Sequence, residues 1–128
     1  MTPFNQPEQE RLKQKGIESF TAVKGWTFRP LDPLDVSYRL FNDNDEVIGY
    51  AEVIPLVRPI RMAYPLPFRI DKLVKLIDKR LNPFLVWSCE DGIMYAKAAD
   101  VTGIFRFKST MFHGYLDKQS AIKYIRYK

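Results

Sequence analysis

Residues 35–54 read DVSYRLFNDNDEVIGYAEVI, and this stretch decides the fold of the chain. Apolar and polar side chains alternate over residues 35–41, and a second run over residues 47–54 is rich in apolar and β-branched side chains. The Asn/Asp-rich segment 42–46 separates the two runs. Alternation bounded by such a cluster predicts two β-strands joined in a hairpin.

One carboxylate interrupts the apolar character of the second strand. Glu52 stands between Ala51 and Val53, in a run that reads as buried. A carboxylate is rarely buried unless it is paired, coordinated or functional. Folding the hairpin antiparallel about Asn44 brings Asp35 opposite the Glu52 end of its partner strand. The sequence therefore predicts two carboxylates at one end of a sheet.

Composition and charge bound the class of protein. The chain has 128 residues, of which 46% are hydrophobic and 14% aromatic, which predicts one globular domain with a real core. The formal net charge of +5 favours an anionic partner, and nucleic acid is the commonest one.

The cysteine and histidine content excludes some chemistries. Cys89 is the only cysteine, so an intrachain disulfide is impossible and a reducing compartment is favoured. His113 is the only histidine, which argues against zinc ligation and against a serine or cysteine hydrolase triad. No apolar run is long enough to span a membrane, and the N-terminus lacks an apolar signal region. We therefore expect a cytoplasmic protein without a membrane partner.

A helix is predicted from Pro7 to about residue 20 or 23, because proline and acidic residues suit a first helical turn. At about 100° per residue, Glu8 and Glu10 lie at the edges of its apolar stripe, while Glu18 points nearly opposite. If a helix carboxylate reaches a site on the sheet, Glu10 or Glu8 is the better candidate. All three could instead be solvated surface.

The segment over residues 55–69 is interrupted by prolines, which exclude a central strand or a helix interior. We expect a long, partly extended loop beside the hairpin. Its arginines, Arg58, Arg61 and Arg69, stand among aromatic residues and suit contact with phosphate and stacking on a base or sugar. The alternative is a loop that is simply pinned on the core by its apolar side chains.

A second helix is predicted over residues 71–81, with Lys72 and Lys75 in its N-terminal half, as nucleic-acid contacts or simply as solvated side chains. Its expected buried face comprises Leu73, Val74, Leu76, Ile77 and Leu81. The continuous apolar run over residues 84–89 predicts a strand at the centre of a sheet.

The remaining chain supplies smaller elements. We expect a short strand over 26–28, a stiff connection over 30–34, a turn over 90–92, a returning strand over 93–97, a connection over 98–101, a short strand over 104–107, a short helix or turn from 117 to 120, and a basic tail over 122–128. This order predicts an α/β or α+β domain with a mixed β-sheet, containing hairpins and flanked by one or two main helices.

Two carboxylates at a bent hairpin, with a helix glutamate nearby, are hard oxygen ligands for Mg²⁺ or Mn²⁺. Such a metal lowers the pKa of a bound water and stabilises charge on a phosphate. A phosphodiesterase also needs a cation beside the attacking water. The natural place is two residues past Glu52 on the same strand face, where this chain has Ile54.

The layout resembles small phage-type members of the PD-(D/E)XK nuclease superfamily. These have a helix with a glutamate, an aspartate opening a hairpin, a Y-x-E-V-K strand, a basic helix, a hydrophobic strand and a D-G hairpin. The matching pieces are the Glu8/Glu10 helix, Asp35 in PLDVSYRLF, Glu52 in YAEVI, Lys72 in IDKLVKLI, and FLVWSCEDGIMYA over residues 84–96. The resemblance implies one restriction-endonuclease-like domain over residues 1–128, with its core over about 8–101 and a C-terminal extension over 102–128.

By this resemblance the chain is expected to be an endonuclease, a hydrolase that cleaves DNA with Mg²⁺ or Mn²⁺. Asp35, Glu52 and Glu10 would be metal ligands and catalytic residues, and Lys72 the catalytic cation. The expected DNA contacts are Arg58, Arg61, Arg69, Lys72 and Lys75. A phage-encoded member would act in the host cytoplasm. The resemblance also allows a homodimer, and the sequence does not decide between a monomer and a dimer.

This chain departs from the family at Ile54, which can neither polarise water nor stabilise an oxyanion. A substitute cation could come from elsewhere, with Lys72 first and Arg58 or Lys75 next. The metal could act alone, at a rate lower by about a hundredfold or more. The site could also be inactive, leaving a scaffold that binds nucleic acid or a host protein.

An unrelated structural or interaction domain is a further alternative. In that case Asp35 only caps a turn, and Glu52 pairs with an arginine such as Arg39.

Overall fold

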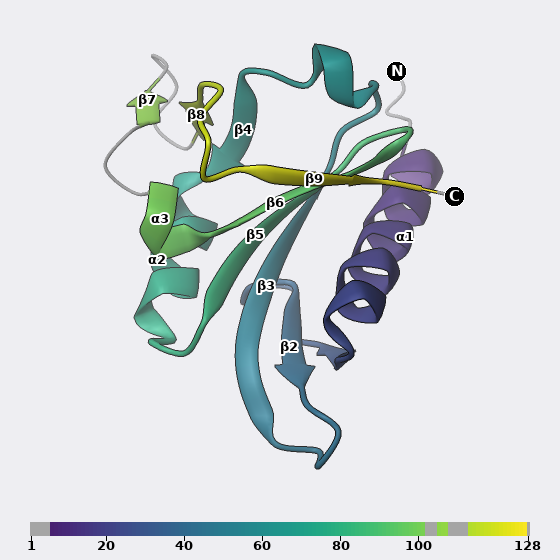
Figure 1. Cartoon of the computed structure of the whole chain (residues 1–128). Helices are drawn as coiled ribbons and strands as arrows, with labels where there is room; N and C mark the ends of the chain where they lie inside the picture. The colour runs from purple at the N-terminus through teal and green to yellow at the C-terminus, as the bar shows by residue number, and fades with distance from the viewer. Residues whose placement is uncertain (1–5, 102–104, 108–112, 128) are drawn as a thin grey trace.

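The computed structural model describes residues 6–101, 105–107 and 113–127, which form two β-sheets, three α-helices and one 3₁₀ turn (Figure 1). In chain order the elements are α1 (Gln6–Lys24), β1 (Thr27–Pro30), β2 (Tyr38–Phe41), β3 (Val47–Pro55), η1 (Ile60–Met62), β4 (Leu66–Arg69), α2 (Ile70–Asp78), β5 (Pro83–Ser88), β6 (Gly92–Lys97), α3 (Ala98–Val101), β7 (Phe105–Phe107), β8 (His113–Leu116) and β9 (Lys123–Arg126).

The main sheet has six strands in the order β1-β2-β3-β5-β6-β9. Strands β3 and β5 are parallel, and each of the other neighbouring pairs in this sheet is antiparallel. A second sheet has the order β4-β8-β7. This is an α+β arrangement with a mixed sheet, as the sequence predicted.

Side chains on the two faces of the main sheet build two separate cores. On one face, α1 packs over β3, β5 and β6, and Phe20 contacts Phe84 and Tyr95 with ring centroids 5.2 and 5.4 Å apart. On the other face, α2, α3 and strand β4 enclose a cluster around Trp87 and Leu85. Figure 1 shows α1 and α2 on opposite sides of β5. Because both faces are covered, β5 is buried from Phe84 to Ser88, and it lies between β3 and β6, which confirms the prediction of a central strand.

The predicted hairpin exists, but its first strand is shorter than expected. Strand β2 begins at Tyr38 rather than at Asp35, and Tyr38 pairs with Ala51. Asp32 causes this late start, because its side chain accepts a hydrogen bond from Leu34 N and its carbonyl accepts one from Asp35 N. These turns keep the residues before β2 out of the sheet.

Helix α2 differs from its prediction in length and in buried face. It ends at Asp78 rather than at Leu81, and only Leu73 and Leu76 of the expected apolar residues are buried. The side chains of Val74, Ile77 and Leu81 are 60%, 42% and 38% exposed. The sheet therefore covers a narrower stripe of this helix than its composition suggests.

The proline-rich segment is not a loop throughout. Its residues 66–69 form β4, which pairs antiparallel with β8. Pro67 fits there because β4 is an edge strand, where a missing backbone N–H is tolerated. The Trp87 indole donates a 2.7 Å hydrogen bond to the Pro67 carbonyl and joins the two sheets.

The C-terminal third contains strands that the sequence did not predict. Strand β9 lies in the expected basic tail and pairs with β6 at the edge of the main sheet. Strand β8 was not predicted, and the expected connection over 98–101 is the helix α3. Of the helix or turn predicted from 117 to 120, the structure has the turn, at Ser120 and Ala121. The predicted strand over 104–107 is confirmed as β7, except that residue 104 lies outside the described residues. None of the described helices has the length and hydrophobicity to cross a membrane.

Candidate functional site

Glu52 is held in place by the residue that enters β2. The Glu52 carboxylate accepts two hydrogen bonds at Oε1, from Ser37 N at 2.9 Å and from Ser37 Oγ at 3.0 Å. The same hydroxyl accepts a 3.1 Å hydrogen bond from Val53 N. Ser37, rather than Asp35, is therefore the direct neighbour of Glu52 across the hairpin.

A cavity of about 420 Å³ opens beside Glu52, at the end of the hairpin. Its walls come from α1, the segment that enters β2, strand β3 and α2. The charged residues lining it are Glu10, Lys13, Asp32, Asp35, Glu52 and Lys72. The tertiary structure thus brings the three predicted metal ligands to one cavity, together with two lysines and a further aspartate.

Of the three candidate glutamates on α1, Glu10 is the one that lines this cavity. Glu8 forms an ion pair of 2.5 Å with Arg11, and Glu18 accepts a hydrogen bond from Gln14 on the helix surface. These local contacts make Glu8 and Glu18 part of a charged helix surface.

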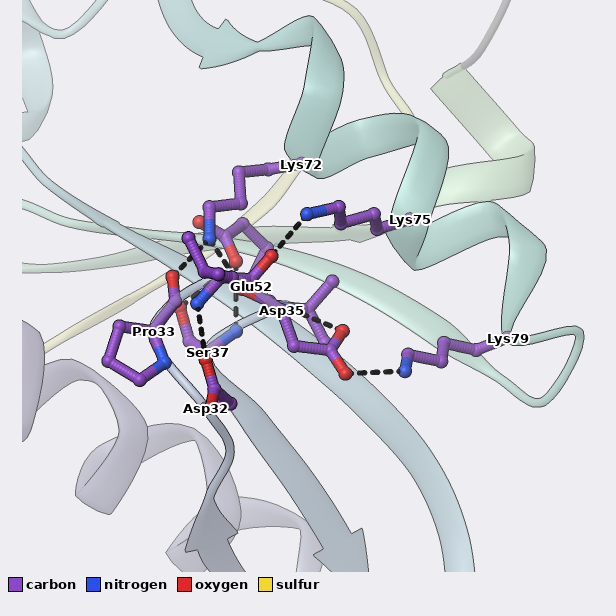
Figure 2. Close-up of polar contacts among 10 residues, drawn as sticks. Asp32, Pro33, Asp35, Ser37, Glu52, Lys72, Lys75 and Lys79 are labelled. Atoms are coloured by element: carbon purple, nitrogen blue, oxygen red, sulfur yellow. Dashed lines mark hydrogen bonds and ion pairs between the residues drawn. The ribbon is translucent and has the colours of Figure 1, made fainter.

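The Asp35 carboxylate is engaged on both oxygens. Oδ2 accepts a 2.8 Å hydrogen bond from Lys79 Nζ, and Oδ1 accepts a 2.7 Å hydrogen bond from Val36 N (Figure 2). The Lys79 ammonium, together with the Val36 amide, holds the pKa of Asp35 below its ordinary value. Asp35 therefore carries a negative charge that is already matched within the protein.

Glu52 has the opposite electrostatic situation. Burial raises its pKa above the ordinary value, and the Ser37 hydrogen bonds and the charges of Lys13 and Lys72 offset that effect only in part. A neighbouring cation would stabilise the ionised form of this side chain. Two carboxylates whose pKa values are pushed apart by their surroundings are common at functional sites.

Three lysines, two on α2 and one directly after its last residue, hold the segment that carries Asp35 (Figure 2). Lys72 Nζ donates to the carbonyls of Pro33 and Asp35 at 2.8 and 2.5 Å. Lys75 Nζ donates to the Leu34 carbonyl, and Lys79 follows one helical turn later. The predicted DNA-binding lysines Lys72 and Lys75 therefore position a loop, and Lys72 also lines the cavity.

Lys13 and Asp32 are charged cavity residues that were not predicted from the sequence. Lys13 is the one whose charge lowers the pKa of Glu52. It lies three residues after Glu10 on α1, and its charge is the largest single ionic influence on the Glu52 pKa. The signal was available, because residues three apart share a helix face. Without the tertiary structure, nothing indicated that this face of α1 lies over Glu52.

Lys13 and Glu52 also line a second cavity, of about 320 Å³, on the Ile54 side. Arg69 and His113 complete the polar part of its lining, and Pro55, Pro67 and Phe68 contribute apolar walls. The strand position two residues past Glu52 is therefore apolar at Ile54, and basic side chains from three other elements line the same cavity.

The remaining arginine candidates divide between structural and surface roles. Arg58 donates to the carbonyls of Ala63 and Pro65 at 2.7 and 3.2 Å, so it braces its own loop and is absent from the Glu52 cavities. Arg69 makes two 3.0 Å hydrogen bonds to Asp71. Arg61 lies at a different cavity.

The expectation that an arginine such as Arg39 neutralises Glu52 finds no contact in support among the described residues. The Arg39 guanidinium instead lies 5.9 Å from the centre of the Tyr50 ring.

Comparison of the chain with protein-family models, with curated proteins and with solved structures found no match. Within the described residues, no group of three or more His, Cys, Asp or Glu side chains is arranged to hold a metal ion.

Proposed function

We propose that the chain is a metal-dependent phosphodiesterase of the PD-(D/E)XK type that cleaves DNA. The observation that carries this proposal is the common cavity of Glu10, Asp35 and Glu52, contributed by three separate segments and lined also by Lys13 and Lys72. Carboxylates facing basic side chains in a cleft suit the binding and hydrolysis of a phosphodiester.

The order of the elements also supports the proposal. A helix with Glu10 precedes the hairpin β2–β3 with Glu52, and α2 with Lys72 leads into the central strand β5. Strand β5 runs parallel to β3 and is followed by a turn with Asp91 and Gly92. This is the order of elements that the resemblance implies.

The residues that would hold Mg²⁺ or Mn²⁺ are Glu52 and Asp35, with Glu10 at the rim. Glu52 fits such an ion because it is a half-buried carboxylate whose charge is incompletely compensated. Asp35 fits it only when the Lys79 contact opens, since both of its oxygens are occupied. The ion would supply an acidified water and would stabilise negative charge on the phosphate.

The protein's own basic side chains would bind and orient the phosphate. Lys13 is placed between the two Glu52 cavities, and Arg69 and His113 line the second one beside Ile54. A phosphate in that second cavity would meet basic groups close to the strand position where the family carries its lysine. Lys13 is therefore our first candidate for the substitute cation, ahead of Lys72, whose ammonium already binds two carbonyls.

A second candidate function is an inactive scaffold that binds DNA. The specific observation in its favour is the Asp35–Lys79 ion pair of 2.8 Å, which replaces a metal contact with an internal one. In this case the basic side chains around Ile54 would bind the DNA backbone without cleaving it.

Cleavage of labelled duplex, single-stranded and branched DNA with Mg²⁺ or Mn²⁺ tests the proposal. The variants are Glu52→Gln and Asp35→Asn, and the matched controls are Glu18→Gln on the surface of α1 and Asp43→Asn in the exposed hairpin turn. We expect cleavage by the parent and both controls, and a loss of at least a hundredfold in the two site variants.

Absence of cleavage with every DNA form and both metals contradicts the nuclease. A gel shift at low salt then decides the second candidate function. Retention of DNA by the parent supports the binding scaffold, and absence of retention excludes it.

A further inference from the structure

A third cavity, remote in sequence from the hairpin, has the composition of a nucleotide site. It has a volume of about 600 Å³ and lies between η1, strand β6, the turn before β9 and β9 itself. This volume is within the range of small-molecule sites in proteins. The residues lining it are Ile60, Arg61, Tyr64, Met94, Lys118, Gln119, Ser120, Ile122, Tyr124 and Arg126.

The charge of this cavity is entirely positive. Arg61, Lys118 and Arg126 line it, and no aspartate or glutamate does. Arg126 is paired with Asp91 at 2.6 Å, but Arg61 and Lys118 are exposed and make no ion pair among the described residues. Two uncompensated cations at the mouth of a cavity favour a multiply charged anion such as a phosphate.

The apolar part of the cavity suits a flat ring. Ile60, Met94 and Ile122 are each at least 92% buried and form an apolar lining. The rings of Tyr64 and Tyr124 border the same space, and the Tyr124 side chain is 58% exposed although it is large and aromatic. An exposed tyrosine beside basic residues is a stacking surface for a nucleobase.

One buried polar atom in the lining has no hydrogen-bond partner within the described part of the chain. Gln119 Nε2 donates a 3.3 Å hydrogen bond to the Asp117 carbonyl, which orients the amide. The Oε1 atom of the same amide is buried and accepts no hydrogen bond from the residues that the structure describes. A buried acceptor without a donor is unfavourable, so it indicates a missing N–H or O–H group. The exocyclic amino or ring N–H group of a base would supply that donor.

We propose that this cavity binds a nucleotide, with the phosphate between Arg61 and Lys118, the base stacked on Tyr124, and a base N–H donating to Gln119 Oε1. The three parts of the ligand correspond to three independent features of one cavity: uncompensated cations, an aromatic and apolar lining, and an orphan acceptor. The site is separate from the Glu52 cavities and shares no lining residue with them. It does not depend on nuclease activity.

Isothermal titration calorimetry in EDTA at about 0.1 M salt tests this proposal, since that ionic strength screens nonspecific attraction. The probes are AMP, GMP, CMP and UMP, the four nucleosides, inorganic phosphate, and a single-stranded DNA hexamer. We expect at least one nucleotide to bind at least tenfold more tightly than its nucleoside and than phosphate. Binding of the hexamer without any mononucleotide would assign the site to a nucleic-acid strand rather than to a free nucleotide.

Matched variants separate the cavity from general charge. Arg61→Ala/Lys118→Ala is expected to weaken nucleotide binding at least tenfold. The control Arg29→Ala/Lys97→Ala removes two exposed cations elsewhere and should leave it unchanged. Gln119→Leu should alter the preference among the four bases while retaining the phosphate contribution, and Tyr124→Ala should weaken all four nucleotides.

The proposal is overturned if no nucleotide or hexamer binds, if phosphate alone binds as well as a nucleotide, or if the control pair weakens binding as much as the cavity pair. Circular dichroism and thermal unfolding establish that each variant is folded. The Glu52→Gln chain should bind nucleotide like the parent, so failure of this proposal and failure of the proposed nuclease give different results.

Discussion

The Lys79 ammonium donates a 2.8 Å hydrogen bond to the Asp35 carboxylate across 44 residues of chain. The two side chains are 26% and 30% exposed, so the ion pair is partly shielded from solvent. It orients Asp35 toward the end of α2 and ties the segment before β2 to that helix. This contact distinguishes the proposed nuclease from the proposed DNA-binding scaffold, because the Asp35 carboxylate can bind either Lys79 or a metal ion.

Replacing Lys79 tests that competition directly. In Lys79→Met the Asp35 carboxylate loses its internal cation, so we expect Mn²⁺ to bind about tenfold more tightly. The loss of the ion pair should reduce the free energy of unfolding by about 1 kcal/mol or less. Electron paramagnetic resonance of free Mn²⁺ measures the affinity, with Lys97→Met as an exposed control. Equal Mn²⁺ affinity in Lys79→Met and the parent would remove Asp35 from the metal site.

The pH dependence of stability reports the state of Asp35. Its pKa is lower in the folded than in the unfolded chain, so ionised Asp35 stabilises the fold above its ordinary pKa of 3.8. That contribution is lost as the pH falls through the folded-state pKa. Asp35→Asn should therefore lower the stability at pH 7 and have little effect at pH 2. Urea unfolding at both pH values measures the difference, and an equal effect at both would contradict the ion pair.

Glu52 should behave in the opposite way. Its pKa is raised in the folded chain, so the protonated side chain favours folding below the ordinary pKa of 4.5, and that advantage disappears as the pH rises through the folded-state pKa. Glu52→Gln keeps an oxygen for Ser37 and removes the buried charge. We expect it to stabilise the fold by about 1 kcal/mol at pH 7 and by nearly nothing at pH 3.

Thermal unfolding at the two pH values checks this prediction. The control is Glu18→Gln, which changes an exposed glutamate on α1. A neutral or destabilising effect of Glu52→Gln at pH 7 would mean that Glu52 is a structural ion-pair residue.

The role of Lys13 as the substitute cation is tested by removing its ammonium and placing one at position 54 instead. Lys13→Met is expected to reduce DNA cleavage about a hundredfold with little change in stability, because Lys13 acts at the cavity and not in the core. Adding Ile54→Lys to that variant places an ammonium on the same strand face as Glu52. The double variant should cleave DNA at least tenfold faster than Lys13→Met alone. Single-turnover cleavage assays measure both effects. A failure of Ile54→Lys to restore any rate in a folded protein would argue against this position as a cation site.

A close approach between α1 and β5 gives a prediction about the fold itself. A Cβ atom on Gly16 would lie 2.6 Å from Ser88 Cβ and 2.9 Å from Ser88 Oγ, in a fully buried contact. Gly16→Ala should therefore cost about 1–3 kcal/mol, although alanine favours helices. Urea unfolding checks this, with Gln14→Ala on the exposed side of α1 expected to change the stability by less than about 0.5 kcal/mol.

Local patterns determined part of the candidate site. The alternation over residues 35–41 and the apolar run around Glu52 predicted the hairpin, because side-chain period and turn composition are local properties. The edge positions on α1 favoured Glu10 or Glu8 over Glu18 as the carboxylate that could reach the sheet, and the structure places Glu10 at the cavity. The hydrogen-bond partner of Glu52 could not be predicted, because the turn at Asp32 shortens β2 and makes Ser37 the neighbour of Glu52.

The sequence by itself determined the hairpin, the central strand β5 and the presence of an unusual carboxylate at Glu52. Only the tertiary structure decided that Asp35 pairs with Lys79, that Lys13 lines the same cavity as Glu52, and that β4 and β9 join sheets. The physical reason is the separation in sequence over which each interaction acts. Periodicity and turn propensity act over a few residues, whereas ion pairs and strand partners depend on which distant segments the packed core brings together.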